Sequence, residues 1–136
     1  MNWIGLDYGK RFIGVAVGNE ITLQAEAIGS VSAYRGVPDW NAIDDLIVDW
    51  HPAGFILGYP LNMDGSQQNI SRLTTLFRKN LIDRYNKPCY LVDERLTSHQ
   101  AKQQLSRNSN KSQLNATAAQ IILQHWFDEA MPTDSV

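Results

Sequence analysis

The stretch Trp3-Ile4-Gly5-Leu6-Asp7-Tyr8-Gly9-Lys10-Arg11-Phe12-Ile13-Gly14-Val15-Ala16-Val17 decides the fold. Its apolar residues, bounded by glycines, predict two strands joined by a tight turn. Asp7 interrupts the apolar pattern, and an ionised carboxylate is costly to bury unless a partner compensates its charge. Asp7 could simply open the turn, because Asp-x-Gly is common turn chemistry. We favour a functional Asp7, since it precedes the turn glycine, still in strand phase, and later residues offer it partners.

Composition and length narrow the class of protein. A chain of 136 residues, 43% of them hydrophobic, predicts one domain over residues 1–131 with a short flexible tail over residues 132–136. The single cysteine, Cys89, excludes a disulfide framework and a cysteine-based zinc site, and we expect it in a buried strand. No apolar run is long enough to span a bilayer, and no charged-then-apolar leader opens the chain. We therefore expect a cytoplasmic protein with no membrane partner.

Charge is unevenly distributed, although the net charge is only −2. Residues 72–111 carry nine basic and three acidic side chains, whereas residues 1–71 carry three basic and eight acidic ones. A basic segment within an acidic chain can bind a phosphate backbone by counterion release. Two ordinary solvated helix faces would give the same distribution, so charge alone does not decide between these alternatives.

The rest of the chain alternates between strand and helix patterns. Alternating apolar residues predict a third strand over residues 22–32, joined to the first two in an antiparallel meander. Pro38 suits the first turn of a helix that His51-Pro52 ends. Beyond it, the pattern predicts strands over residues 53–59 and 89–92, and helices over residues 67–85, 97–105 and 112–130. The loop over residues 58–66 leaves a parallel strand at the end where α/β proteins bind ligands.

This order predicts an α/β fold with a mixed five-stranded sheet flanked by helices. Three antiparallel strands come first, and two parallel strands follow, because right-handed crossovers place them parallel to the first strand. The first strand is then central, beside the strand over residues 53–59. Asp7, Glu94 at the end of the last strand, and Asn115 at the start of the last helix would converge.

Two carboxylates and an amide form a hard oxygen site, which suits Mg²⁺ or Mn²⁺ rather than zinc. Phosphodiester hydrolysis needs an activated water and a stabilised leaving oxygen, and divalent ions held by carboxylates supply both. Lys10, Arg11 and Arg95 lie close in sequence to the two acids and could contact substrate phosphates. On a regular strand Asp93 should face away from Glu94, so we expect a structural role for it.

Four motifs resemble those of the YqgF family, in order and over nearly the whole chain. They are Gly5-Leu6-Asp7-Tyr8-Gly9 with residues 13–17, Gly58-Tyr59-Pro60-Leu61-Asn62-Met63-Asp64-Gly65, Asp93-Glu94-Arg95-Leu96-Thr97-Ser98, and Leu114-Asn115-Ala116-Thr117-Ala118-Ala119 with residues 122–124. The resemblance implies an RNase H-like fold, divalent metal, hydrolysis of nucleic-acid phosphodiesters, and maturation of the 5′ end of the 16S rRNA precursor. The family is also described as Holliday junction resolvases.

The family's acids map onto Asp7, Glu94 and the position of Asn115. Asn115 is a departure, because the family pattern has aspartate there. An amide oxygen can bind a metal but lacks the charge, so the resemblance implies a weakened second metal site.

Other functions stay open at this stage. A ribosome-assembly factor could keep the fold and bind nucleic acid without cutting it, and the resolvase alternative would act on branched DNA. An ATP-binding protein of the actin and sugar-kinase type needs two such domains, which the length does not supply. The sequence contains no motif for recognising particular bases, so structured RNA and branched DNA are both candidate partners. We expect a monomer or a weak homodimer.

Overall fold

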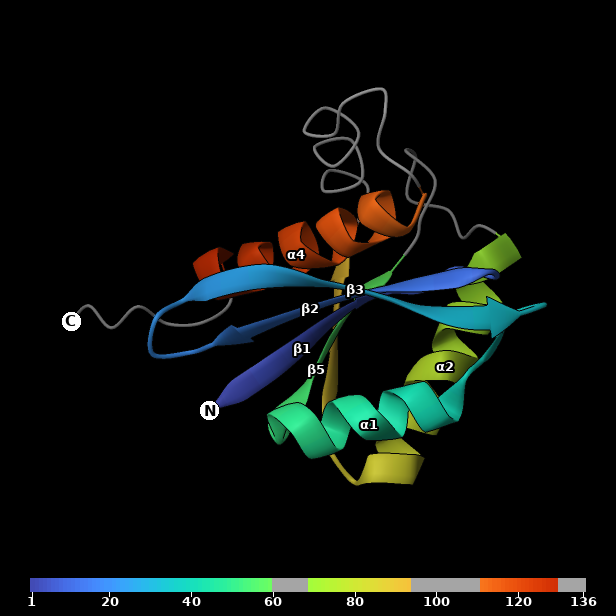
Figure 1. Ribbon diagram of the computed structural model, residues 1–136, viewed down its shortest axis with the longest axis horizontal. Helices are drawn as coiled ribbons and strands as arrows, with labels where there is room; N and C mark the ends of the chain where they lie inside the picture. Colours follow the sequence, from blue (N-terminus) through green and yellow to red (C-terminus); the bar gives the residue numbers. More distant parts are fainter. Residues whose placement is uncertain (60–68, 94–110, 130–136) are drawn as a thin grey trace.

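The computed structural model describes residues 1–59, 69–93 and 111–129, and within them it contains one six-stranded sheet and three helices (Figure 1). The elements are β1 (Asn2–Asp7), β2 (Phe12–Asn19), β3 (Gln24–Tyr34), β4 (Val37–Pro38), α1 (Trp40–Trp50), β5 (Pro52–Tyr59), α2 (Asn69–Tyr85), β6 (Cys89–Asp93) and α4 (Lys111–Glu129). In these ranges, no helix combines the length and hydrophobicity that crossing a bilayer requires.

The sheet has the order β4-β3-β2-β1-β5-β6. β1, β2 and β3 pair antiparallel, whereas β5 is parallel to β1 and β6 is parallel to β5. The predicted meander followed by two parallel strands is therefore confirmed, with β1 central and β5 beside it.

The five-strand prediction was wrong by one strand. Val37 and Pro38 form the short strand β4, which pairs antiparallel with Ala33 and Tyr34 at the end of β3. Pro38 thus lies in a strand rather than in the first helical turn. This is possible because a proline on a short edge strand leaves no donor unpaired in the sheet interior.

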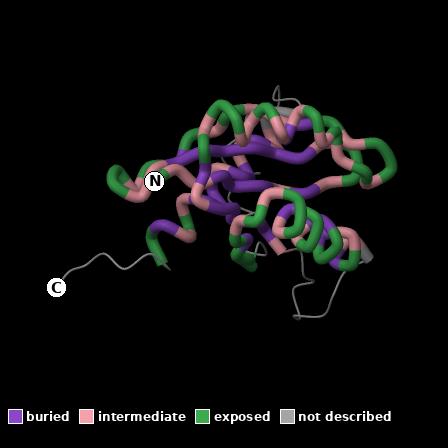
Figure 2. The backbone as a smooth tube through the Cα atoms, turned by 90° about the horizontal axis from the view of Figure 1, so that it is seen from below, coloured by how far each residue is buried: buried purple, intermediate pink, exposed green. Residues whose placement is uncertain are grey.

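Helices cover both faces of the sheet. Figure 1 shows α4 on one face, with α1 and α2 on the other, and in Figure 2 the buried strand residues lie between these layers. On the α1 and α2 side, Ile4, Leu6, Phe55 and Leu57 pack with Phe77 and other helix residues. On the α4 side, Ala16 and Ile56 pack with Leu123 and Phe127. Side chains of one strand alternate between these two cores, as the period of a strand requires.

The ends of α1 follow from local chemistry. The Asp39 side chain accepts a hydrogen bond from the Ala42 N–H (3.3 Å), which caps the start of the helix. His51 ends it in a left-handed conformation with φ of 46°, while its N–H donates to the Ile47 carbonyl. His51 is therefore the helix-end residue that the sequence predicts.

One polar group ties α1 to α2. Asp44 accepts hydrogen bonds from Arg84 Nη2 (2.8 Å) and from the Tyr85 hydroxyl (2.6 Å). The hydrogen bond from Arg84 is the main cause that lowers the pKa of Asp44 to about 2. The two helices on this face are thus joined by charge as well as by apolar packing.

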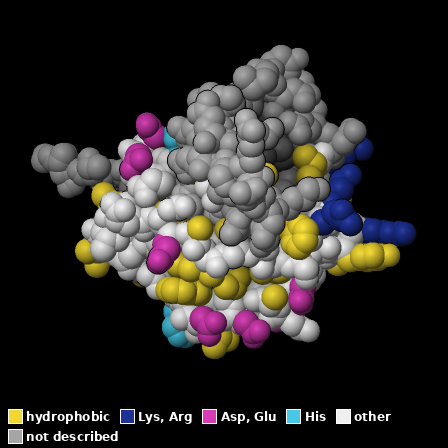
Figure 3. Space-filling view, turned by 45° about the horizontal axis from the view of Figure 1, so that its top comes forward, with side chains coloured by type: hydrophobic (Ala, Val, Ile, Leu, Met, Phe, Trp, Pro, Cys, Tyr) yellow, Lys and Arg dark blue, Asp and Glu magenta, His cyan; other side chains and the backbone are white. Residues whose placement is uncertain are grey.

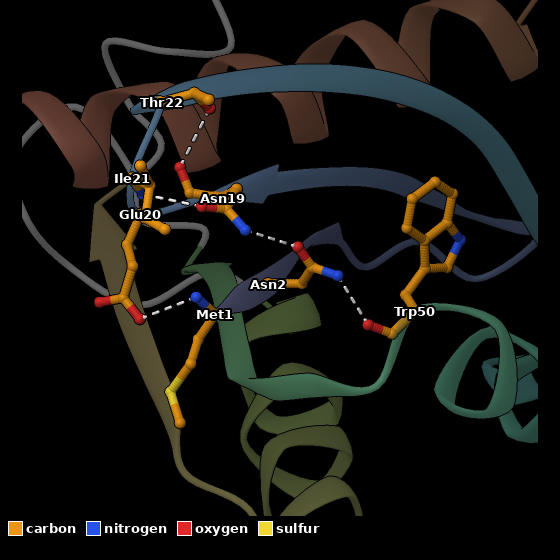
Figure 4. Close-up of polar contacts among 7 residues, drawn as sticks. All are labelled: Met1, Asn2, Asn19, Glu20, Ile21, Thr22 and Trp50. Atoms are coloured by element: carbon orange, nitrogen blue, oxygen red, sulfur yellow. Dashed lines mark hydrogen bonds and ion pairs between the residues drawn. The ribbon is translucent and has the colours of Figure 1, made fainter.

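A second polar group fixes the start of β1 (Figure 4). Asn2 Nδ2 donates to the Trp50 carbonyl (2.8 Å), and Asn19 Nδ2 donates to Asn2 Oδ1 (3.0 Å). These side chains link β1, β2 and the end of α1. They lie at the end of β1 opposite Asp7, so they set the register of the strand without entering the candidate site.

Candidate functional site

Asp7 is the last residue of β1 and lies on the α4 side of the sheet. Its neighbours Leu6 and Tyr8 are both buried in the core shared with α1 and α2. Alternation along the strand therefore turns Asp7 to the opposite face, together with Trp3 and Gly5. Asp7 is half-buried, so the costly carboxylate that the sequence singles out is placed at the sheet's surface and not in its core.

Gly14 lies between Asp7 and the start of α4. Gly14 of β2 pairs directly with Asp7 in the antiparallel register. A Cβ atom built on Gly14 would overlap the Asn115 carbonyl group and lie 3.0 Å from the Ala116 nitrogen. Only glycine permits this approach of helix backbone to strand. Gly14 of β2 thus lies between Asp7 and the backbone of Asn115.

Two glutamines hold α4 in this position. The Ala25 N–H of β3 donates to Gln124 Oε1 (2.9 Å), and Gln124 Nε2 donates to the Leu23 carbonyl (2.8 Å). Gln120 Nε2 donates to the Ala25 carbonyl (3.1 Å). These hydrogen bonds fix the helix along β3, so the place of Asn115 does not rest on apolar packing alone.

Two neighbouring turns lie at the Asp7 end of the sheet. The Gly36 N–H donates to the Lys10 carbonyl (3.0 Å), and the Ala33 N–H donates to the Arg11 carbonyl (2.8 Å). The Tyr8 hydroxyl donates to the Gly36 carbonyl, and burial raises the pKa of Tyr8. The backbone of both turns is therefore fixed, while the Lys10 and Arg11 side chains are exposed.

Basic side chains gather beside this end of the molecule. Figure 3 shows Lys and Arg side chains gathered at one edge of the face it presents. Lys10, Arg11 and Arg35 are the exposed basic residues of the two joined turns. The sequence indicates the first two by their closeness to Asp7, whereas Arg35 lies in a turn over residues 34–36 whose glycine is its only local signal.

The structure describes only part of the predicted site. Asp7, Asn115, Lys10 and Arg11 are placed, whereas Glu94 and Arg95 lie outside the described residues, as do the predicted helix over residues 97–105 and most of the loop over residues 58–66. Within the described part of the chain, no three His, Cys, Asp or Glu side chains form a group that could hold a metal. Cys89 is buried in β6, as predicted.

Comparison with known proteins identifies the family. The model of the RuvX family, described as "Holliday junction resolvase", matches residues 1–129. The chain belongs to this family. The resemblance to the YqgF family, which is the same family, is thereby confirmed. A RuvX-family relative from Pseudomonas fluorescens strain Pf-5, named "Putative pre-16S rRNA nuclease", is 43% identical over 132 residues, covering 93% of this chain and 91% of the relative. A protein of the same name from Pseudomonas aeruginosa strain PAO1 is 40% identical over 131 residues, covering 93% and 91%.

Solved structures confirm the RNase H-like fold of this RuvX-family chain. RuvC of T. thermophilus in complex with a Holliday junction substrate has a TM-score of 0.59 at 18% identity, covering 98% of this chain and 97% of RuvC. A second Thermus thermophilus RuvC structure has a TM-score of 0.55 at 16% identity, covering 98% of both chains.

Proposed function

We propose that this protein is a divalent-metal-dependent nuclease that hydrolyses nucleic-acid phosphodiesters, with the 5′ end of pre-16S rRNA as its substrate. The names of relatives at 40% and 43% identity support this substrate. The observation that carries the proposal is the placement of Asp7 across Gly14 from the start of α4. The half-burial of Asp7 and the approach of the Asn115 backbone to the paired residue Gly14 support a shared site for these two residues.

Glu94 is the expected second acid. It follows β6 directly in the sequence, and β6 places Tyr90 and Val92 against the Trp3 and α4 side of the sheet. The period of two along a strand predicts the same face for Glu94 and the opposite face for Asp93. This alternation supports a shared face for Asp7 and Glu94.

These residues fit a divalent metal by the chemistry of their donors. Asp7, Glu94 and Asn115 offer hard oxygen atoms, the kind of ligand that Mg²⁺ and Mn²⁺ prefer, and Asp7 is only half-buried. They would hold Mg²⁺ or Mn²⁺, which when bound supplies an activated water and stabilises the leaving oxygen. The protein's own contribution is to fix Asp7 on a central strand and to offer Lys10, Arg11 and Arg95 to the phosphate backbone.

The test is cleavage of an end-labelled pre-16S-like RNA with Mg²⁺, with Mn²⁺ and with EDTA. Asp7→Asn should abolish metal-dependent cleavage while the fold is retained. Asp45→Asn is the matched control, because Asp45 is an exposed acid on α1, across the sheet from Asp7. Cleavage that persists in Asp7→Asn, or that EDTA does not stop, would refute the proposal.

The same purified proteins test two alternative functions. The RuvC-like fold favours a four-way DNA junction as a second substrate, and preferential cutting of that junction would replace the rRNA assignment. Asn115 in place of an acid favours an assembly factor that binds without cutting. RNA binding that is equal in wild type and Asp7→Asn, with no cleavage by either protein, would establish that role.

A further inference from the structure

An exposed aromatic side chain lies at the tip of the two joined turns. Tyr34 ends β3 and is 72% exposed, and Val37 on the paired strand β4 is 63% exposed. The Arg35 guanidinium lies over the Tyr34 ring, with its central carbon 5.4 Å from the ring centroid. Among the described residues, a ring this exposed contributes little to the buried core.

The backbone beneath this pair is fixed. Arg35 and Gly36 are both left-handed, with φ of 52° and 86°. A Cβ on Gly36 would lie 2.9 Å from the Tyr8 hydroxyl, so the turn is pressed against the end of β1. With the hydrogen bonds from Gly36 and Ala33 to the Lys10 and Arg11 carbonyls, the turn is preorganised and loses little entropy when a ligand binds.

Tyr34 faces the same side of the sheet as Asp7. Ser30 of β3 pairs with Gly14, which pairs with Asp7, and all three share the α4 face. Tyr34 is four residues beyond Ser30 along β3, whereas its neighbour Ala33 packs toward the opposite core. At about 3.3 Å per residue, Tyr34 lies roughly 13 Å along β3 from Ser30, the residue of β3 that is level with Asp7. That distance is about four stacked nucleotides at 3.4 Å each.

We propose that Tyr34 and Arg35 form a stacking platform for an unpaired nucleobase, several nucleotides from the phosphate at Asp7. Aromatic rings and guanidinium planes accept splayed bases of any identity. Lys10 and Arg11 supply positive charge to the adjoining phosphates. A shallow hollow of about 430 Å³ runs beside the platform, lined by Ser32, Ala33, Tyr34, Val37, Pro38 and Asp39. The substrate class is therefore nucleic acid with single-stranded nucleotides beside the cut, and this inference rests on the proposed nuclease function.

The test measures binding in EDTA, so that it is independent of cleavage. The probes are a single-stranded RNA oligonucleotide carrying 2-aminopurine and its fully paired duplex. Tyr34→Leu should weaken single-strand binding about fivefold or more and abolish the quenching of 2-aminopurine that stacking causes. Tyr34→Phe, which keeps the ring, should retain both, and duplex binding should change less than twofold in either variant.

The outcomes separate this inference from the nuclease proposal. Wild-type cleavage with unchanged binding and quenching in Tyr34→Leu would overturn the platform and leave the nuclease standing. Equal loss of single-strand and duplex binding in Tyr34→Leu would also overturn it, because the residue would then act on the backbone or on the fold. Quenching by wild type that is lost in Tyr34→Leu, with no cleavage by wild type, would support the platform on a fold that does not act as a nuclease. No binding of either probe by wild type would overturn it in favour of a protein partner at this edge.

Discussion

Replacing Gly14 with alanine tests whether the contact between β2 and the start of α4 builds the site. The added methyl group would overlap the Asn115 carbonyl and lie 3.0 Å from the Ala116 nitrogen. Cβ atoms in proteins essentially never lie closer than 3.0 Å to another heavy atom of this kind. The obstructing atoms belong to helix backbone and cannot rotate away, so the start of α4 must move by about 1 Å. Overpacking of this kind costs about 1–3 kcal/mol of unfolding free energy.

Two measurements follow from that displacement. A cost of about 2 kcal/mol should lower the Tm by roughly 8 °C in a domain of this size. A shift of about 1 Å between Asn115 and Asp7 should reduce nuclease activity on the order of 100-fold at temperatures where the variant stays folded. Thermal unfolding followed by circular dichroism and cleavage of end-labelled RNA provide the two readouts.

Gly54→Ala is the matched control. Its methyl group would lie 2.7 Å from the Pro88 carbonyl oxygen and 2.7 Å from a Trp3 ring carbon, at the opposite end of the parallel strands. It should lower stability to a similar extent and leave cleavage by the folded protein intact. An unchanged Tm in Gly14→Ala, or equal loss of activity in both folded variants, would refute the reasoning.

Two further predictions concern metal binding and pH. Asn115→Asp adds a carboxylate beside Asp7 and should tighten Mn²⁺ binding roughly tenfold in calorimetry, whereas equal affinity in Asn115→Asp and wild type would count against a ligand role. Burial raises the pKa of the Cys89 thiol from its usual 9.0 to about 12, so native protein at pH 8 should resist a thiol reagent that labels the urea-unfolded chain at once. Between these two pKa values the folded state holds the proton that the unfolded state releases, so stability should fall from pH 9 toward pH 12 in urea titrations, and rapid native labelling would contradict the burial of Cys89.

The sheet was predictable because its signals are local. Alternating apolar residues around Asp7, with the crossover rule for the later strands, fixed the order of five strands and the central place of β1. β4 was missed because two residues carry no period, and because Pro38 is equally suited to a helix start. Its formation depends on the Ala33 and Tyr34 backbone, which is a tertiary contact.

The site was only partly predictable, because part of it also depends on tertiary contacts. Asp7 is visible as an acid in an apolar strand, and Asn115 as a polar first-turn residue. The role of Gly14 depends on how closely a distant helix approaches, which no local pattern encodes. No local pattern singles out Tyr34 and Arg35, since their exposure and ring contact arise only when the two turns join.

The glutamines of α4 also protect the border of the sheet. In the described residues β3 pairs with β2 along one edge, whereas on its other edge β4 pairs only with Ala33 and Tyr34, so the first part of that outer edge has no partner strand. Gln120 and Gln124 take up the N–H and carbonyl groups of Ala25 and the carbonyl of Leu23, as a neighbouring strand would. An unpaired edge invites strand addition from other molecules and thus aggregation. The helix therefore serves solubility too, since its amides occupy the hydrogen-bonding groups that a second chain would need.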